Sequence, residues 1–154
     1  MQLMILRHGQ AENFAVSDDA RNLTKVGRAQ AAAMGAKLAE FAVPPTVIAH
    51  SPLVRTTQTA NIVQQRLNAE QLEIWPELVH QGSPEAVEQK LMASGFENVL
   101  LVTHMPLIAI FEHYLLSGDK YGGSPFNPCE LAVLNSDDAY PGNWQLIKRV
   151  KPSV

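Results

Sequence analysis

The sequence of 154 residues is poor in cysteine and has no long apolar segment. A single cysteine, Cys129, excludes an internal disulfide and favours a reducing compartment. No apolar run reaches the roughly 20 residues that a membrane-spanning helix needs. The short apolar start of the chain is interrupted at once by Arg7 and His8, which is unlike a secretory signal. We therefore expect a cytoplasmic protein without a membrane partner.

Charge is also scarce, and neither sign dominates. Charged residues make up 18% of the chain and the formal net charge is -3, so no overall attraction to nucleic acid or anionic lipid is expected. Any anion-binding site must be local. The hydrophobic content of 46% is typical of a globular protein. Because no linker or repeat divides the chain, we expect one domain over residues 1–154.

Short apolar runs alternate with stretches of helical periodicity, which predicts a layered α/β fold. Strands are expected at about residues 2–7, 46–50, 72–75, 98–103, 131–134 and 144–150, the last two forming a hairpin. Helices are expected at about residues 25–41, 52–67, 84–94 and 105–116. Thr24, Ser51 and Ser83 are the predicted N-caps of the first three helices.

Polar residues follow three of the predicted strands. His8, Ser51 and His104 each come directly after a strand, and Arg55 lies one helical turn beyond Ser51. The carboxyl ends of parallel strands share one edge of a sheet, where ligands bind. We therefore expect these four side chains to meet in one cleft.

Three short motifs give this pattern a family resemblance. Arg7-His8-Gly9, the segment 51–60 (SPLVRTTQTA) and Thr103-His104-Met105-Pro106 together resemble the histidine phosphatase superfamily, the phosphoglycerate mutase-like enzymes. The segments 17–24 (SDDARNLT) and 104–107 (HMPL) look most like its compact SixA-type phosphohistidine phosphatases. The resemblance implies a three-layer sandwich, with a mostly parallel sheet flanked by helices and no large cap.

The resemblance also implies chemical roles. His8 would be the nucleophile and become a transient phosphohistidine, while Arg7 and Arg55 would clamp the phosphoryl oxygens, since guanidinium forks match phosphate. His104, protonated when phosphate is bound, would donate to an equatorial oxygen. A turn at Gly9, itself part of the expected substrate site, would bring a carbonyl to the His8 ring. No metal and no cofactor is expected, because these cations supply the charge that Mg²⁺ supplies elsewhere.

The roles of four further residues stay open. Arg21, in the polar loop after the first strand, either faces the phosphate, as in SixA-like sequences, or is a solvated loop residue. Glu77 is either the acid that protonates the leaving group or a loop carboxylate. A phosphohistidine needs less help from such an acid, because imidazole is a good leaving group once protonated. His50 could line the cleft but is predicted to be packed or hydrogen-bonded, and His80 could touch the substrate but is predicted to be a bystander.

The expected substrate follows from the missing cap. Only 48 residues separate Arg55 from His104, and the predicted strands and helices use nearly all of them. Larger relatives place extra helices there, which close over small metabolites. An open pocket suits a phosphoryl group on a protein surface, such as phosphohistidine on a histidine phosphotransfer domain. The alternatives are a small-molecule phosphomonoesterase that uses Glu77 and a non-catalytic phosphate-binding module.

Overall fold

A computed structural model describes residues 1–153, which are built around one six-stranded sheet. The strands lie in the order β3, β2, β4, β1, β5, β6. Their bounds are Gln2–Arg7 (β1), Val47–His50 (β2), Gln71–Ile74 (β3), Asn98–Thr103 (β4), Leu131–Asn135 (β5) and Gln145–Val150 (β6). The first four strands in this order are parallel, whereas β5 is antiparallel to both β1 and β6. The predicted mostly parallel sheet and its closing hairpin are confirmed.

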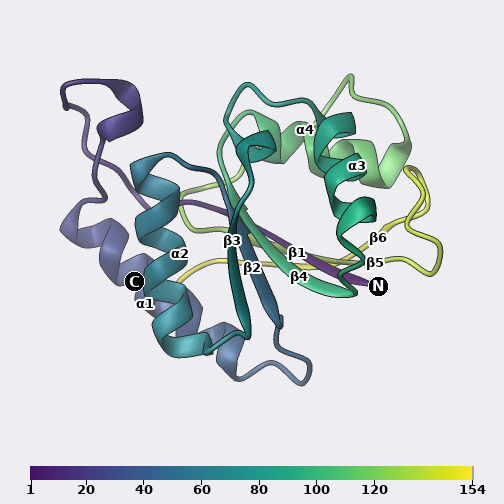
Figure 1. Cartoon of the computed structure of the whole chain (residues 1–154), viewed down its shortest axis with the longest axis horizontal. Coiled ribbons are helices and arrows are strands. Elements are labelled where there is room, and N and C mark those ends of the chain that lie inside the picture. The colour runs from purple at the N-terminus through teal and green to yellow at the C-terminus, as the bar shows by residue number, and fades with distance from the viewer. Residues whose placement is uncertain (154) are drawn as a thin grey trace.

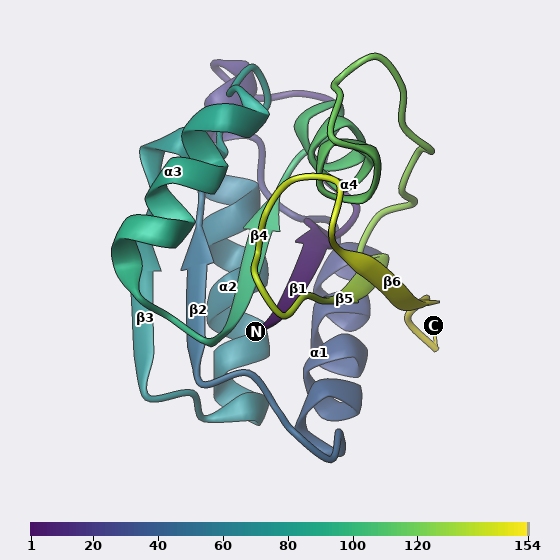
Figure 2. The same ribbon diagram turned by 90° about the vertical axis from the view of Figure 1, so that its right-hand side faces the viewer.

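Helices cover both faces of the sheet and complete the predicted three layers (Figure 1, Figure 2). One face carries α1 (Lys25–Ala39) and α2 (Val54–Leu67), and the other carries α3 (Pro84–Ser94) and α4 (Leu107–Ser117). Two short 3-10 helices, η1 (Asp18–Ala20) and η2 (Pro76–Leu78), lie in loops. No helix within residues 1–153 is long and apolar enough to cross a bilayer.

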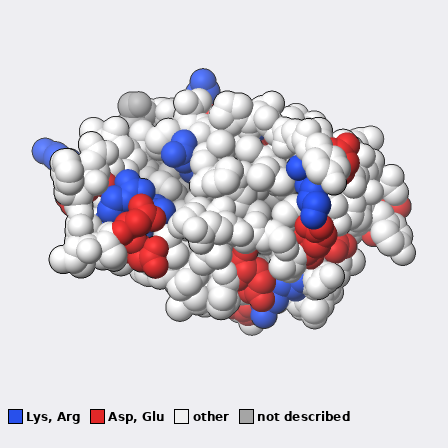
Figure 3. All heavy atoms as spheres, turned by 90° about the horizontal axis from the view of Figure 1, so that it is seen from above, with Lys and Arg blue, Asp and Glu red and all other residues white. Residues whose placement is uncertain are grey.

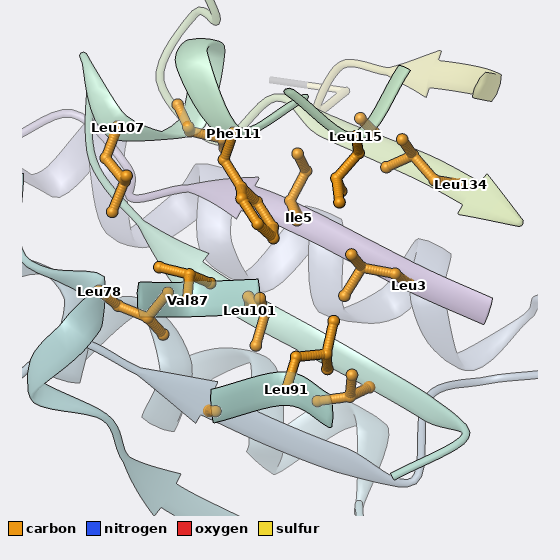
Figure 4. Packing of buried hydrophobic residues seen from close by; sticks show 14 of the residues in the cluster. Leu3, Ile5, Leu78, Val87, Leu91, Leu101, Leu107, Phe111, Leu115 and Leu134 are labelled. Atoms are coloured by element: carbon orange, nitrogen blue, oxygen red, sulfur yellow. The ribbon is translucent and has the colours of Figure 1, made fainter. Parts of the chain in front are cut away.

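The central strand β1 is buried on both faces. Leu3 and Ile5 pack in the core beneath α3 and α4, where Figure 4 shows Ile5 beside Phe111. Met4 and Leu6 belong to the core on the opposite face, beneath α1 and α2. Because side chains alternate along a strand, an unbroken apolar run fits a strand that is covered on both sides. The end of β1, where Arg7 and His8 lie, is therefore held from both faces.

Local side-chain chemistry explains where two helices begin. The Thr24 side chain accepts a hydrogen bond from the N–H of Gly27 at the start of α1, as predicted for an N-cap. At the start of α3, Ser83 accepts from the N–H of Ala86, and Pro84 occupies the first turn. Both predicted caps are confirmed.

The predicted N-cap at Ser51 is wrong. Helix α2 begins only at Val54, and Leu53 precedes it without a side-chain cap. The Ser51 hydroxyl lies 2.6 Å from Thr56 Oγ1 and 2.6 Å from His104 Nε2. The Ser51 hydroxyl therefore joins the ends of β2 and β4 and does not cap α2.

Candidate active site

The carboxyl ends of three parallel strands bring buried polar residues to one edge of the sheet. His8 follows β1, His50 and Ser51 lie at the end of β2, and His104 follows β4. All four residues are buried. Buried polar groups need partners, so the contacts of these side chains determine what the edge can do.

The His8 imidazole is fixed in one orientation by the residue that follows it. Its Nδ1 lies 2.7 Å from the carbonyl oxygen of Gly9, and because a carbonyl only accepts, Nδ1 carries the proton and Nε2 the lone pair. The N–H of Gly9 donates to Thr59 Oγ1 at 3.1 Å. A Cβ at Gly9 would lie 2.6 Å from the carbonyl oxygen of Gly27, so a larger residue does not fit without a backbone shift. Gly9 meets the expectation of a turn that orients the ring.

The turn before β5 holds the end of β1 from the other side. The N–H of Cys129 donates to the carbonyl of His8 at 3.0 Å, and Arg7 N–H donates to the carbonyl of Glu130 at 3.1 Å. Arg7 Nη1 donates to the carbonyl oxygen of Phe126 at 2.7 Å. Cys129 is buried in the core and desolvation raises the pKa of its thiol to about 12, which fits the predicted packing role. Arg7 and His8 are thus positioned by backbone contacts on both sides.

Arg55 approaches His8 from the first turn of α2. Its Nε donates to His8 Nε2 at 3.3 Å. Its Nη1 donates to the carbonyl oxygen of Asp18 at 2.9 Å, and its Nη2 lies 3.2 Å from Asp18 Oδ2. The side chain is almost completely buried. Arg55 therefore joins the end of β1 to the loop that carries η1.

Asp18 is a site residue that the sequence analysis missed. Its carboxylate pairs with Arg55 and also with Arg21, whose Nε lies 3.0 Å from Oδ1. Desolvation raises the pKa of Asp18, but the charges and hydrogen bonds of Arg55 and Arg21 outweigh it and lower the pKa overall. The signal was present in the 17–24 segment that resembles SixA-type sequences. Arg7, His8, Asp18, Arg55 and His104 form a group that we call the cluster. Arg21 is linked to the cluster through Asp18 and also donates to the carbonyl of Glu12 at 3.1 Å.

His104 lies beside His8, and His80 lies beside His104. The ring centroids are 5.2 Å apart for His8 and His104 and 5.8 Å apart for His80 and His104. His104 Nδ1 is buried and has no hydrogen-bond partner among residues 1–153. His80 Nε2 is 3.8 Å from Asp18 Oδ2. The loop after η2 thus brings the His80 ring beside His104 and Asp18, where it could also touch a substrate.

Burial and neighbouring cations keep the two central histidines neutral. Desolvation is the main cause that lowers the pKa of His8 to about 4, and the charges of Arg55, Arg7 and Arg21 lower it further, against the hydrogen bond to Gly9. Desolvation, followed by the charges of His8 and Arg55, lowers the pKa of His104 even more. At neutral pH the edge therefore presents an unprotonated imidazole nitrogen among arginine cations, an arrangement suited to a nucleophile that meets an oxyanion.

Two further sets of side chains could take part in chemistry near this edge of the sheet. Glu77 lies in η2, and its Oε1 is buried without a hydrogen-bond partner among residues 1–153. Asp18, Asp19 and His80 place one potential metal-ligand atom each within 4.8 Å of one another, so these residues could hold a cation. The Asp18 carboxylate, however, is already paired with the guanidinium groups of Arg21 and Arg55.

The comparisons with known proteins agree with this geometry. Residues 3–81 match the family model of the histidine phosphatase superfamily (branch 1). The phosphohistidine phosphatase SixA of Escherichia coli (strain K12) is 32% identical over 154 residues, which cover 95% of this chain and 93% of that protein. A phosphohistidine phosphatase SixA homolog of Haemophilus influenzae is 34% identical over 119 residues, covering 70% of this chain and 73% of that protein.

The same relationship is evident in three dimensions. The solved structure of the protein histidine phosphatase SixA complexed with tungstate superimposes with a TM-score of 0.89 at 30% identity. The match covers 99% of this chain and 97% of that one, so the compact layout of the sheet and helices is shared over nearly the whole length. The chain therefore belongs to the histidine phosphatase superfamily, branch 1.

Proposed function

We propose that this protein is a phosphohistidine phosphatase that removes the phosphoryl group from a histidine of a signalling protein. The observation that carries the proposal is the His8 ring, which is oriented by Gly9 and presents its Nε2 lone pair beside Arg55. The similarity to SixA proteins over nearly the whole chain supports the same assignment. The partner protein would be recognised by its phosphohistidine, the group that reaches His8.

The proposed reaction has two steps in which the phosphoryl group changes partners. Arg55 Nε gives up its hydrogen bond to His8 Nε2, and the lone pair of Nε2 attacks the phosphorus in line, so that a new N–P bond forms while the N–P bond of the substrate breaks. The electron pair of the broken bond leaves with the substrate imidazole, which takes up a proton from water. Water then attacks the phosphorus on His8, the electron pair of the N–P bond returns to Nε2, and inorganic phosphate leaves.

Arg7 and Arg55 are proposed to bind the phosphoryl oxygens in both steps. Arg55 is held rigidly by burial and by its contacts with Asp18, and Arg7 is held by the carbonyl of Phe126. Donors that are in place before the reaction stabilise developing charge without a cost of reorganisation. The planar guanidinium also offers two parallel donors to a phosphoryl group, which an ammonium does not.

His104 is proposed to become protonated when the oxyanion binds. The Thr56 hydroxyl donates to backbone carbonyl groups at 2.9 and 3.0 Å, so it accepts from Ser51, and Ser51 in turn accepts from His104 Nε2–H. A neutral ring therefore has only a lone pair at Nδ1. To donate a hydrogen bond from Nδ1 to a phosphoryl oxygen, the ring must take up a second proton. A bound dianion favours this uptake by offsetting the neighbouring positive charge.

The absence of inserted helices supports a protein substrate. Between Arg55 and His104 the chain forms the rest of α2, then β3, η2, α3 and β4, all of which belong to the sandwich and its connecting loops. The site is therefore not covered by an additional helical segment from this part of the chain. A phosphoryl group on a folded protein can approach such an edge, whereas a small metabolite would gain little from it.

One observation favours a second candidate, a small-molecule phosphomonoesterase. The buried, unpartnered Oε1 of Glu77 is the kind of carboxyl group that could protonate an alkoxide leaving group. Replacing Glu77 by Gln separates the two functions. A large loss with phosphate esters and little loss with phosphohistidine supports the phosphohistidine phosphatase, since only the ester needs the acid.

A substrate panel tests the proposal directly. The panel contains histidine phosphotransfer domains phosphorylated on histidine, a phosphoserine peptide and sugar phosphates. We expect the fastest hydrolysis with a phosphohistidine protein. Rapid hydrolysis of sugar phosphates, with every phosphohistidine protein left intact, would overturn the proposal. Binding of phosphate without any turnover would instead identify a phosphate-binding module.

A further inference from the structure

The loop between β1 and α1 carries two large apolar side chains that are almost completely in water. Phe14 is 88% exposed and Val16 is 100% exposed. Figure 1 shows this loop, with η1, standing away from the sheet. Single exposed apolar residues are common on protein surfaces, so the position of these two decides whether they matter.

Hydrogen bonds hold the base of this loop in place. The N–H of Glu12 donates to the carbonyl oxygen of Asn22 at 2.8 Å, which closes the loop like the start of a hairpin. Arg21 Nη1 donates to the carbonyl of Glu12 at 3.1 Å, and its Nε pairs with Asp18 Oδ1 at 3.0 Å. One guanidinium thus ties both ends of the segment 13–17, which we call the tip. A segment that is held in place before binding loses less entropy when a partner docks.

The tip is continuous with the proposed catalytic cluster. Asp18 directly follows the tip, and both its carbonyl and its carboxylate contact Arg55, which contacts His8. A shallow groove of about 330 Å³ is lined by Asn13, Phe14, Ala15, Ser17, Asp18 and Arg21. The groove therefore joins the apolar tip to the ion-paired residues of the cluster.

Charge offers little to guide a partner to this side of the molecule. Figure 3 looks down from the top of Figure 1, the side on which the η1 loop projects, and most of that face is uncharged. Lys and Arg side chains there adjoin Asp and Glu side chains in small patches, and no extended field of one sign is present. Because steering by charge is weak on such a face, contact between apolar groups is the better source of selectivity.

We propose that the tip is a docking site for the protein that carries the phosphohistidine, with Phe14 and Val16 as its anchors. This inference rests on the proposed function. A phosphoryl group on a histidine side chain lies close to its own protein's surface, so that surface must approach the rim of the cluster when the phosphorus reaches His8. The expected partner has an apolar depression beside its phosphorylated histidine. Aromatic anchors that enter such depressions contribute most of the binding energy at many interfaces.

The test compares a protein substrate with a small one. In the variant Phe14→Ser/Val16→Ser, kcat/KM for the histidine phosphotransfer domain that the wild-type chain turns over fastest is expected to fall by roughly 10- to 100-fold. For free phosphohistidine, kcat/KM is expected to be unchanged, because it does not reach the tip. Both replaced side chains are exposed, so the variant is expected to fold.

A matched control replaces an exposed valine and an exposed aromatic residue on other loops. Val43 is 57% exposed between α1 and β2, and Tyr140 is 66% exposed between β5 and β6. The variant Val43→Ser/Tyr140→Ser is expected to match the wild type with both substrates. An equal loss in this control would mean that general surface polarity, and not docking at the tip, sets the rate.

Three results would overturn the inference. Unchanged kcat/KM of the tip variant with the phosphorylated domain would reject docking while leaving the proposed function intact. An equal loss with free phosphohistidine would show that the tip supports the cluster and does not dock a protein. A change in self-association of the tip variant, measured by sedimentation, with unchanged kcat/KM would identify a second copy of the chain as the occupant. Failure of the wild type on every phosphohistidine protein would reject the proposed function itself.

Discussion

His8 and His50 lie at the carboxyl ends of two parallel strands, with β4 between them. His50 is the last residue of β2, whereas His8 follows the last residue of β1. Both rings are buried. Nδ1 lies 2.7 Å from the carbonyl oxygen of Gly9 in His8 and 2.8 Å from that of Ser51 in His50. Burial lowers the pKa of both imidazoles. A strand end followed by a turn is therefore enough to orient an imidazole and keep it neutral.

The two rings differ in the charges that surround them. Arg55 donates to Nε2 of His8, and the charges of Arg55, Arg7 and Arg21 add to burial in lowering its pKa. The pKa of His50 responds only to burial and to its hydrogen bond with Ser51. The chain thus makes the same local arrangement twice, and one of the two rings is surrounded by the groups that we propose to bind an oxyanion. The neighbouring cations, and not the oriented ring alone, therefore distinguish the proposed nucleophile His8 from His50.

The largest expected effect comes from changing His8 to asparagine, with the same change at His50 as its control. The asparagine amide can retain a hydrogen bond to the neighbouring carbonyl. His8→Asn is expected to reduce turnover by at least about 10,000-fold, because the proposed nucleophile is lost. His50→Asn is expected to leave turnover nearly unchanged. Single-turnover hydrolysis of a phosphohistidine protein measures both. Substantial turnover by His8→Asn would reject the proposed mechanism.

The next largest effect is expected at Arg55, the arginine that contacts the His8 ring. Arg55→Lys keeps a positive charge but loses the planar fork, and we expect kcat to fall by roughly 100- to 1,000-fold. Arg66→Lys, at the exposed end of the same helix, is the matched control and should have wild-type activity. If Arg55→Lys keeps wild-type activity, charge alone suffices and the fork geometry has no part in the reaction.

Stability should also depend on pH in a way that separates the two rings. His8 stays neutral in the folded state down to about pH 4, whereas in the unfolded chain it binds a proton near pH ~6.5. The unfolded state binds more protons in this range, so the free energy of unfolding should fall by about 2 kcal/mol from pH ~7 to pH ~5 through His8 alone. Urea titrations at several pH values measure this dependence of the free energy of unfolding on pH. His8→Asn should remove more of the dependence than His50→Asn. A larger loss of the pH dependence in His50→Asn than in His8→Asn would contradict the stronger lowering of the His8 pKa.

The smallest expected effect concerns the support of His104. Ser51→Ala removes the oxygen that lies 2.6 Å from His104 Nε2, and we expect kcat to fall by roughly 10-fold and inhibition by the proposed product, inorganic phosphate, to weaken. Thr57→Val provides a control, because the Thr57 hydroxyl donates to the carbonyl oxygen of Leu53, the residue before α2. Unaltered inhibition by phosphate in Ser51→Ala would show that His104 needs no such support.

Local rules predicted most of the fold because the relevant signals are local. The strand at β4 and the caps at Thr24 and Ser83 follow from apolar runs and from side chains next to helix starts. Ser51 also matches the rule for a cap, but its hydroxyl bonds to a ring 53 residues away. A contact of that kind exists only once two strands lie side by side in the sheet.

The same limit applies to the site. His8, Arg55 and His104 follow predicted strands or helix starts, so topology alone indicates that they meet. Asp18 and His80 lie in loops, and the paths of those loops depend on packing that no periodicity encodes. Their place in the cluster or beside it therefore became evident only from the folded chain, although the 17–24 segment already resembled one branch of the superfamily.

The most direct test of the central claim is to trap the phosphorylated enzyme. The wild-type chain is mixed with a radiolabelled phosphohistidine protein, quenched rapidly in alkali, which preserves phosphohistidine, and digested for peptide mapping. We predict that the label appears transiently on His8 and on no other histidine, since His8 Nε2 is the proposed nucleophile and lies 3.3 Å from Arg55 Nε. Label on His50, His80 or His104, or product formation with no labelled enzyme at any time, would contradict the account.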